Sequence, residues 1–100
     1  MIRGSTPTLK FELPLEIDNN VTKLRLTFKQ NGEIVFEKTE KDIVINEQFF
    51  TVRLTQEETL MFDSSCPIRM QVKIRTTDGN VVPSDVVLIE CKDVLSEEIL

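Results

Sequence analysis

Five acidic side chains are the residues of this chain that could carry acid–base chemistry. They are Glu57, Glu58, Asp63, Asp78 and Asp85. Glycoside hydrolysis needs two carboxyl groups that face each other across a cleft. Each of the five lies in a predicted loop, cap or turn, where Asp and Glu are common for local reasons. We therefore expect no catalytic residue and no enzymatic activity.

The residues needed for nucleophilic triads, metal sites and phosphate-binding loops are missing from the sequence. The chain has no histidine, so it can build neither a Ser-His-Asp triad nor a histidine metal site. Cys66 and Cys91 are too few for structural zinc, and neither belongs to a CxxC motif. We expect free, packed thiols, with a disulfide across the sheets as the alternative. The glycines, at positions 4, 32 and 79, form no phosphate-binding loop. We expect no metal, no cofactor and no small-molecule substrate.

Two alternating apolar runs, each closed by a loop that ends in glycine, predict the frame of the molecule. Residues 24–36 contain one such pair of runs and residues 68–88 the other. Alternation with period two predicts strands with one buried face, and the loops predict antiparallel hairpins. In the first hairpin we expect a three-residue loop, Gln30 to Gly32, because an Asn31-Gly32 turn would set Phe28 opposite Val35.

The three-residue loops fix a predicted register for both hairpins. In the first, the expected pairs are Lys29 with Glu33, Phe28 with Ile34, Leu26 with Phe36 and Arg25 with Glu37. In the second, they are Ile74 with Val82, Met70 with Val86 and Ile68 with Leu88. Pro83 lacks an N–H group, so we expect an edge strand or a bulge there.

The rest of the chain completes an all-β domain. The expected strands cover residues 8–13, 21–29, 33–39, 43–45, 49–54, 68–76 and 80–90. About seven strands are typical of an antiparallel, immunoglobulin-like β-sandwich. Thr55 and Glu58 fit a capping box, which predicts one helical turn from Thr55 to Phe62. We expect a flexible arm over residues 1–7, the sandwich over 8–92 and an acidic tail over 93–100, either a short helix or frayed.

Candidate interaction residues are those expected to point away from the core. Phe11, Phe28, Phe36 and Phe50 share the inward phase, whereas Phe49 should point outward, as a contact residue or as a satellite of the core. With Val35, Val81 or Val87 it would form an apolar patch for self-association or for another protein. The cations Lys23, Arg25 and Lys29 share one strand face, which could be a docking patch. Alternatively, Glu33 and Glu37 neutralise it as cross-strand pairs.

Charge and hydropathy limit the partners. The net charge is −5, so repulsion from phosphate argues against nucleic acid. Residues 51–100 carry five basic and nine acidic side chains. No window has the roughly 18 to 20 apolar residues of a membrane span, and the first residues lack the apolar core of a signal peptide. We expect a soluble chain that is not exported.

Several short motifs resemble one group of proteins. They are MIRGSTPT at 1–8, FELP at 11–14, KQNG at 29–32, LTQEETL at 54–60 and Ser84-Asp85. Together they resemble short acidic proteins encoded in phage and prophage regions of Gram-positive bacteria. The chain is also distantly similar to the β-sandwich module at the start of some phage baseplate proteins. The motifs are turn and cap signals and transfer no site residue.

The resemblance implies a non-enzymatic tail or baseplate-associated protein that works by protein–protein contact, in the bacterial cytoplasm during assembly or in the virion. Its expected partners are other phage structural proteins or further copies of itself. The alternative is a stand-alone binding or regulatory protein whose acidic half occupies a basic site on a host or phage partner.

Overall fold

The computed structural model describes residues 1–12, 21–46 and 49–100. Within that part of the chain the strands are β1 (Thr8–Glu12), β2 (Val21–Gln30), β3 (Glu33–Thr39), β4 (Ile43–Asn46), β5 (Phe49–Arg53), β6 (Ile68–Thr76), β7 (Val81–Pro83) and β8 (Val87–Ile89). A 3-10 turn, η1 (Glu40–Asp42), precedes β4, and a short helix, α1 (Gln56–Leu60), follows β5. The all-β prediction is confirmed. Position 13 and positions 14–20, including Pro14, lie outside the described residues.

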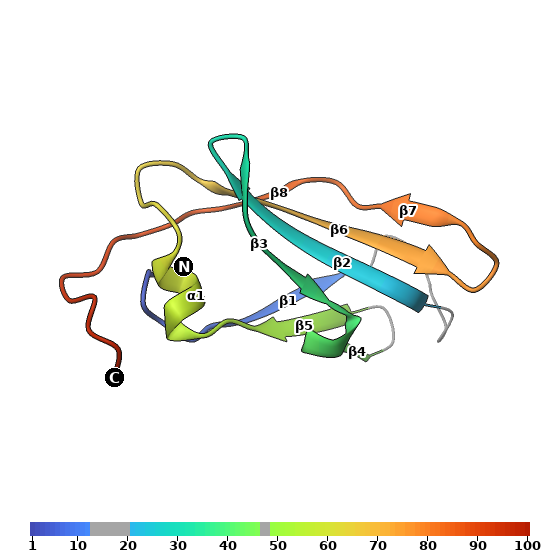
Figure 1. The fold of residues 1–100 in the computed structure, drawn as a ribbon, viewed down its shortest axis with the longest axis horizontal. Coiled ribbons are helices and arrows are strands. Elements are labelled where there is room, and N and C mark those ends of the chain that lie inside the picture. Colours follow the sequence, from blue (N-terminus) through green and yellow to red (C-terminus); the bar gives the residue numbers. More distant parts are fainter. Residues whose placement is uncertain (13–20, 47–48) are drawn as a thin grey trace.

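The strands form two antiparallel sheets that stack as a sandwich (Figure 1). The three-stranded sheet has the order β1-β5-β4, and the larger sheet has the order β3-β2-β6-β7, with β8 also paired to β6. The helix α1 lies on the connection from β5 of the three-stranded sheet to β6 of the larger sheet. One core fills the space between the sheets, because inward residues of both belong to the same cluster of buried side chains.

The predicted inward phase is confirmed along β2, β5 and β6. Leu26, Phe50 and Val72, for example, are at most 1% exposed. Phe28 packs against Phe36, with ring centroids 4.8 Å apart. Phe11 and Phe36 are partly buried and pack against the same cluster. Burial of these alternating apolar side chains, each contributing about 1.5–3 kcal/mol, fixes which face of each strand turns inward.

The first hairpin corrects the predicted three-residue loop. Gln30 pairs with Glu33 across a two-residue Asn31-Gly32 turn, whose residues have φ of 52° and 76°. An extra residue in β3, Val35, then restores the apolar phase, so that Phe28 pairs with Phe36 rather than Ile34. Such a bulge sets two residues of one strand against one of its partner. The expected pairings of the first hairpin were therefore wrong, although its inward phase at Phe28 and Phe36 was right.

The second hairpin begins as predicted and then shifts. Thr76 N donates to Asn80 O at 2.9 Å, which closes the expected three-residue loop, and Ile74 pairs with Val82. Beyond Pro83, where β7 ends, the register moves by one residue. The observed pairs are Met70 with Val87 and Ile68 with Ile89, not Val86 and Leu88. The edge strand and the irregularity expected at Pro83 are both present.

The helical turn and the two ends of the chain meet on one side of the molecule (Figure 1). Thr55 and Glu58 form the predicted capping box of α1. Residues 1–7 run beside residues 90–93: Ile2 bridges Lys92 in parallel, and Arg3 N donates to Lys92 O at 2.9 Å. Residues 93–100, expected to be helical or frayed, form neither a helix nor a strand. In the described part of the chain, no helix is long and apolar enough to cross a membrane.

Candidate functional site

The five candidate carboxylates are spread over α1 and three connections. Glu58 caps α1 and pairs with Lys38. Asp63 accepts a hydrogen bond from Ser65 N at 2.8 Å, and Asp78 accepts from Thr76 Oγ1 and Asn80 N inside the β6–β7 turn. These bonds hold the pKa of Asp63 and Asp78 below the ordinary value. Each of the three carboxylates therefore has a local structural partner.

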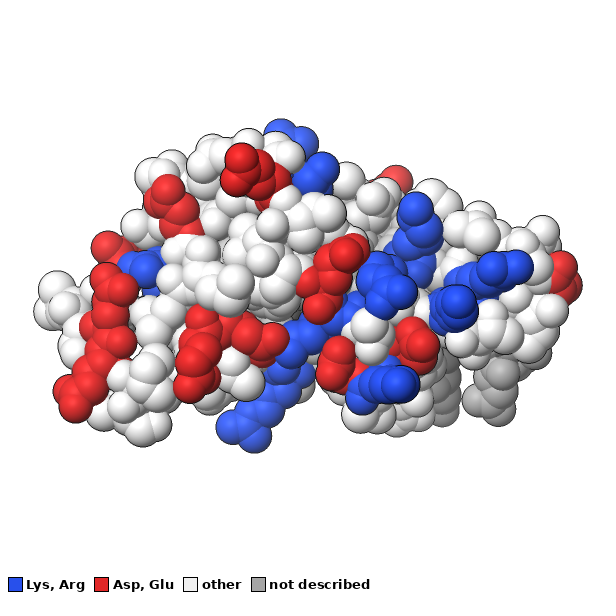
Figure 2. Space-filling model, viewed as in Figure 1, with Lys and Arg blue, Asp and Glu red and all other residues white. Residues whose placement is uncertain are grey.

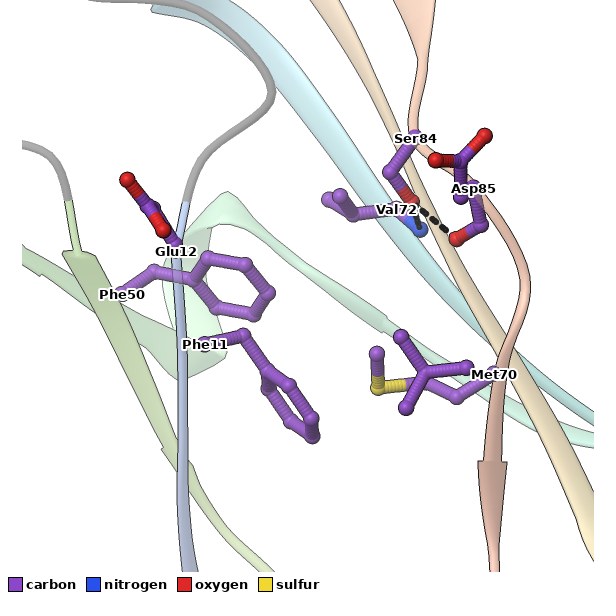
Figure 3. Close-up of a pocket in the computed structure, with 8 residues that line it drawn as sticks. Phe11, Glu12, Phe50, Met70, Val72, Ser84 and Asp85 are labelled. Atoms are coloured by element: carbon purple, nitrogen blue, oxygen red, sulfur yellow. Dashed lines mark hydrogen bonds between the residues drawn. The ribbon is translucent and has the colours of Figure 1, made fainter.

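A cavity of about 390 Å³ opens between the two sheets (Figure 3). Its lining consists of Phe11, Glu12, Phe50, Met70, Val72, Ser84, Asp85 and Val87. Ser84 Oγ accepts from Val72 N at 3.1 Å and donates to Asp85 O at 2.9 Å. The hydroxyl thereby completes the strand ladder where β7 ends. The cavity is thus lined mainly by apolar side chains of the core, and Glu12, Ser84 and Asp85 are its polar residues.

Both cysteines are free thiols. Cys66 is half-buried and Cys91 is buried, and both line a cavity of about 430 Å³ with Leu88 and Glu90. Burial raises the pKa of the Cys91 thiol, although the nearby positive charge of Arg3 opposes this rise. A raised pKa leaves less thiolate, the form that reacts or binds metal. Among the described residues, no three His, Cys, Asp or Glu side chains are grouped to hold a metal ion.

The outer side of β2 and β6 is covered with exposed cations. The directly opposed outward pairs are Lys23 with Arg75, Arg25 with Lys73, Thr27 with Gln71 and Lys29 with Arg69. We call these eight residues the basic face. Three of its four pairs set like charges opposite each other, which destabilises an antiparallel sheet. Half of the twelve basic residues of an acidic chain are therefore concentrated where their mutual repulsion acts against folding.

The acids expected to pair with Arg25 and Lys29 stand opposite other residues of β2, because the turn is shorter than expected and β3 carries a bulge. Glu33 pairs with Gln30 rather than Lys29, and Glu37 with Thr27 rather than Arg25. Glu37 accepts a hydrogen bond from Thr27 Oγ1 at 2.7 Å. Among the ion pairs between described residues, none includes a cation of the basic face. The predicted direct pairs, Lys29 with Glu33 and Arg25 with Glu37, were therefore wrong. Glu37 still lines the same groove as Arg25, and the docking-patch alternative stays open.

A groove of about 580 Å³ crosses the basic face. Two exposed apolar side chains line it, Ile34 (55% exposed) and Val86 (50%). Four cations and three neutral or acidic side chains also line it: Arg25, Lys29, Arg69, Lys73, Thr27, Gln71 and Glu37. The groove thus has one apolar side chain on each flank, Ile34 beside β2 and Val86 beside β6, with the cations of these two strands between them.

The register shifts in the two hairpins change which of two adjacent apolar residues faces solvent, at Ile34-Val35 and at Val86-Val87. Of the two valines expected to point outward, Val35 is partly buried and packs against the core. Val87 stands opposite buried Met70 and lines the cavity between the sheets, but it is still 37% exposed. Ile34 and Val86 take the outward positions instead. The sequence did not identify Ile34 and Val86 as outward-facing, because each is next to another apolar residue, Val35 or Val87. Alternation alone does not indicate which of two adjacent apolar residues a bulge turns outward.

Phe49 and Val81 do point outward, but from different sheets. Phe49 is 39% exposed on the three-stranded sheet, where Lys10 Nζ lies 4.6 Å from its ring centroid. Val81 is 54% exposed opposite Arg75, at the edge of the larger sheet. The four predicted contact residues therefore do not form one patch.

Charge is unevenly distributed along the molecule (Figure 2). Asp and Glu side chains predominate on the left, around α1 and the end of the chain, whereas most Lys and Arg side chains lie at the centre and on the right, with several acids among them. The molecule is elongated, with extents of 47 × 27 × 16 Å.

No family model matches the chain, and neither a curated protein nor a solved structure matches it.

Proposed function

We propose that this protein is a non-enzymatic structural or assembly protein of a phage or prophage, associated with the tail or baseplate, that acts by protein–protein contact. The observation that carries the contact role is the basic face and its groove. Like-charged residues in opposed positions cost stability, and a partner with negative charge offsets that cost. The phage context rests on the sequence resemblance.

The chemistry of the groove supports a protein partner. Protein interfaces combine apolar contacts with polar ones, and the groove offers both, with Ile34 and Val86 on its flanks and four cations between them. Complementary charge also speeds encounter and excludes wrong partners. Single-stranded nucleic acid is bound on aromatic stacking platforms, and no aromatic side chain lines the groove. We therefore propose a protein partner rather than a nucleic acid.

The acidic end supports the alternative function. Exposed acids around α1 and residues 93–98 could occupy a basic site on a host or phage protein. In that case the acidic end, and not the basic face, would carry binding.

Mass spectrometry of particles induced from the encoding bacterium tests the proposal. We expect the chain in purified particles at a copy number comparable to that of tail proteins. The double variant Arg25→Glu with Lys73→Glu should lose incorporation, whereas Lys10→Glu with Arg53→Glu, at exposed sites on the three-stranded sheet, should keep it. Equal incorporation of both variants would refute a role for the basic face. Absence of the chain from particles, with a tight one-to-one complex in host lysate, would favour the alternative.

A further inference from the structure

The segment 94–99 presents apolar side chains that the protein itself does not cover. Leu95 is fully exposed, and Ile99 is 46% exposed. Glu97 and Glu98 stand between them and are exposed as well. Two exposed apolar side chains with acids between them are the chemical counterpart of the groove, where cations lie between exposed Ile34 and Val86.

Contacts on both sides hold this segment beside α1. Arg3 donates to Asp93 Oδ1 at 2.6 Å and lies 3.6 Å from Glu97. Leu100 N donates to Gln56 Oε1 at 3.0 Å. The Arg3 side chain also binds the carbonyl oxygens of Leu60 and Phe62, which fixes it at the end of α1. The segment is therefore anchored away from the groove of its own molecule, on the side where α1 and the chain ends meet (Figure 1).

We infer that residues 94–99 of one copy dock in the groove of a second copy, with Leu95 and Ile99 on Ile34 and Val86. Glu98 then faces the cations that lie between Ile34 and Val86, among them Arg69 and Lys73. This inference rests on the proposed function, because it assigns a partner to the same basic face. Charge complementarity favours a second copy: one molecule carries both the cationic groove and the acidic apolar segment.

The contact joins two different surfaces, so it is heterologous. After one contact, one copy keeps a free groove and the other a free segment, and such contacts close into rings or grow into open filaments. The contact is small compared with a standard interface, so we expect weak affinity, about micromolar or weaker. Because it depends on exposed charges, salt should weaken it: the Debye length falls from about 10 Å at 0.1 M to about 3 Å at 1 M.

Two complementary variants test the arrangement by sedimentation velocity. The groove variant carries Arg69→Ser and Lys73→Ser and keeps its segment. The segment variant carries Leu95→Ser and Glu98→Ser and keeps its groove. All four residues are exposed, and thermal melting checks that both variants fold. The matched control is Lys10→Ser with Arg53→Ser, which removes two exposed cations from the three-stranded sheet.

We expect the unchanged chain and the control to associate at low salt, with association weakened about tenfold or more at high salt. Each variant alone should be monomeric. A mixture of the two should form one-to-one dimers only, because one intact segment meets one intact groove. A mixture that stays monomeric, or association that survives in either variant alone, would overturn the inference. Oligonucleotide binding that only the groove variant loses would also overturn it, in favour of a phosphate partner.

The same measurements separate this inference from the proposed function. If the unchanged chain is monomeric at high concentration yet enters particles through its basic face, self-docking is wrong and the proposed function stands. If the chain neither associates nor enters particles, both are wrong.

Discussion

Lys38 on β3 forms an ion pair with Glu58 on α1, and both side chains are largely buried, 13% and 22% exposed. Lys38 shares the phase of Phe36, and its ammonium lies 5.9 Å from the centroid of that ring. Glu58 also accepts a hydrogen bond from Thr55 N at 2.9 Å within the capping box. One carboxylate therefore starts the helix and ties it to the five-stranded sheet.

Replacing either partner should destabilise the domain. Lys38→Met leaves the Glu58 carboxylate largely buried without its cation, and Glu58→Gln weakens both the pair and the cap. We expect each to lower the free energy of unfolding by about 1–3 kcal/mol, measured by urea titration. Lys41→Met, at an exposed position on η1, should change it by less than about 0.5 kcal/mol. In a double-mutant cycle, additive effects would show that the two residues do not interact.

The ion pair should also appear in the pH dependence of stability. Burial raises the pKa of Glu58, but the hydrogen bonds from Lys38 and Thr55 outweigh it, so the pKa is lowered overall. A carboxyl with a lowered folded-state pKa stabilises the fold above its unfolded pKa, about 4.3, and loses that contribution as the pH falls through the folded value. Stability of the unchanged chain should therefore fall below about pH 4.3, and Lys38→Met should flatten this dependence. Parallel profiles would contradict the assignment.

Gly32 should tolerate no β-branched residue, for conformational reasons alone. Its φ is 76°, and a Cβ built there would meet no atom within 4 Å. Because the left-handed conformation costs an L residue about 1–2 kcal/mol, Gly32→Val should lower the free energy of unfolding by about that amount. Asn31→Gly should be nearly neutral, since glycine adopts the observed φ of 52° freely. Unchanged stability of Gly32→Val in denaturant titration would mean that the turn is not the observed one.

The sequence predicted strands well and their register poorly. The expected bounds of β3 and β6 agree with the structure, because long alternating runs are unambiguous. A bulge adds one residue and changes the phase of everything beyond it. Ile34-Val35 and Val86-Val87 offer two similar apolar residues at each bulge, so composition could not reveal which one faces solvent.

The basic face shows the same limit for tertiary pairing. The cations of β2 were visible in the sequence as one strand face, and those of β6 alternate in the same way. What the sequence did not reveal is that β2 pairs with β6 on its other side, so that Arg25 meets Lys73. Strand partners far apart in the chain are set by packing of the core, not by local pattern.

The two thiols should differ in reactivity. Cys91 is 7% exposed, and burial raises its pKa, so both access and thiolate fraction are low. At neutral pH and in the absence of denaturant, iodoacetamide should modify Cys66 well before Cys91, as followed by peptide mass spectrometry. Raising the pH should speed the reaction at Cys91, and denaturant should make the two rates similar. Faster modification of Cys91 than of Cys66 in the folded chain would contradict the observed burial.

Removing charge from the basic face should increase stability. Arg25 and Lys73 stand directly opposite each other, and like charges so placed cost about 0.2–1 kcal/mol. Lys73→Thr should therefore raise the free energy of unfolding by about that amount at low salt and change it little near 1 M NaCl, where the repulsion is screened. Leu26→Asp, one position from Arg25 on the buried side, should unfold the domain, which would confirm that residue 26 faces the core and residue 25 faces solvent. If removing Lys73 makes the domain more stable, the cation lowers the free energy of unfolding in the unchanged chain. A role in binding a partner would explain why it is present. A loss of stability in Lys73→Thr that persists at high salt would instead indicate that Lys73 packs structurally, and the case for a docking face would fail.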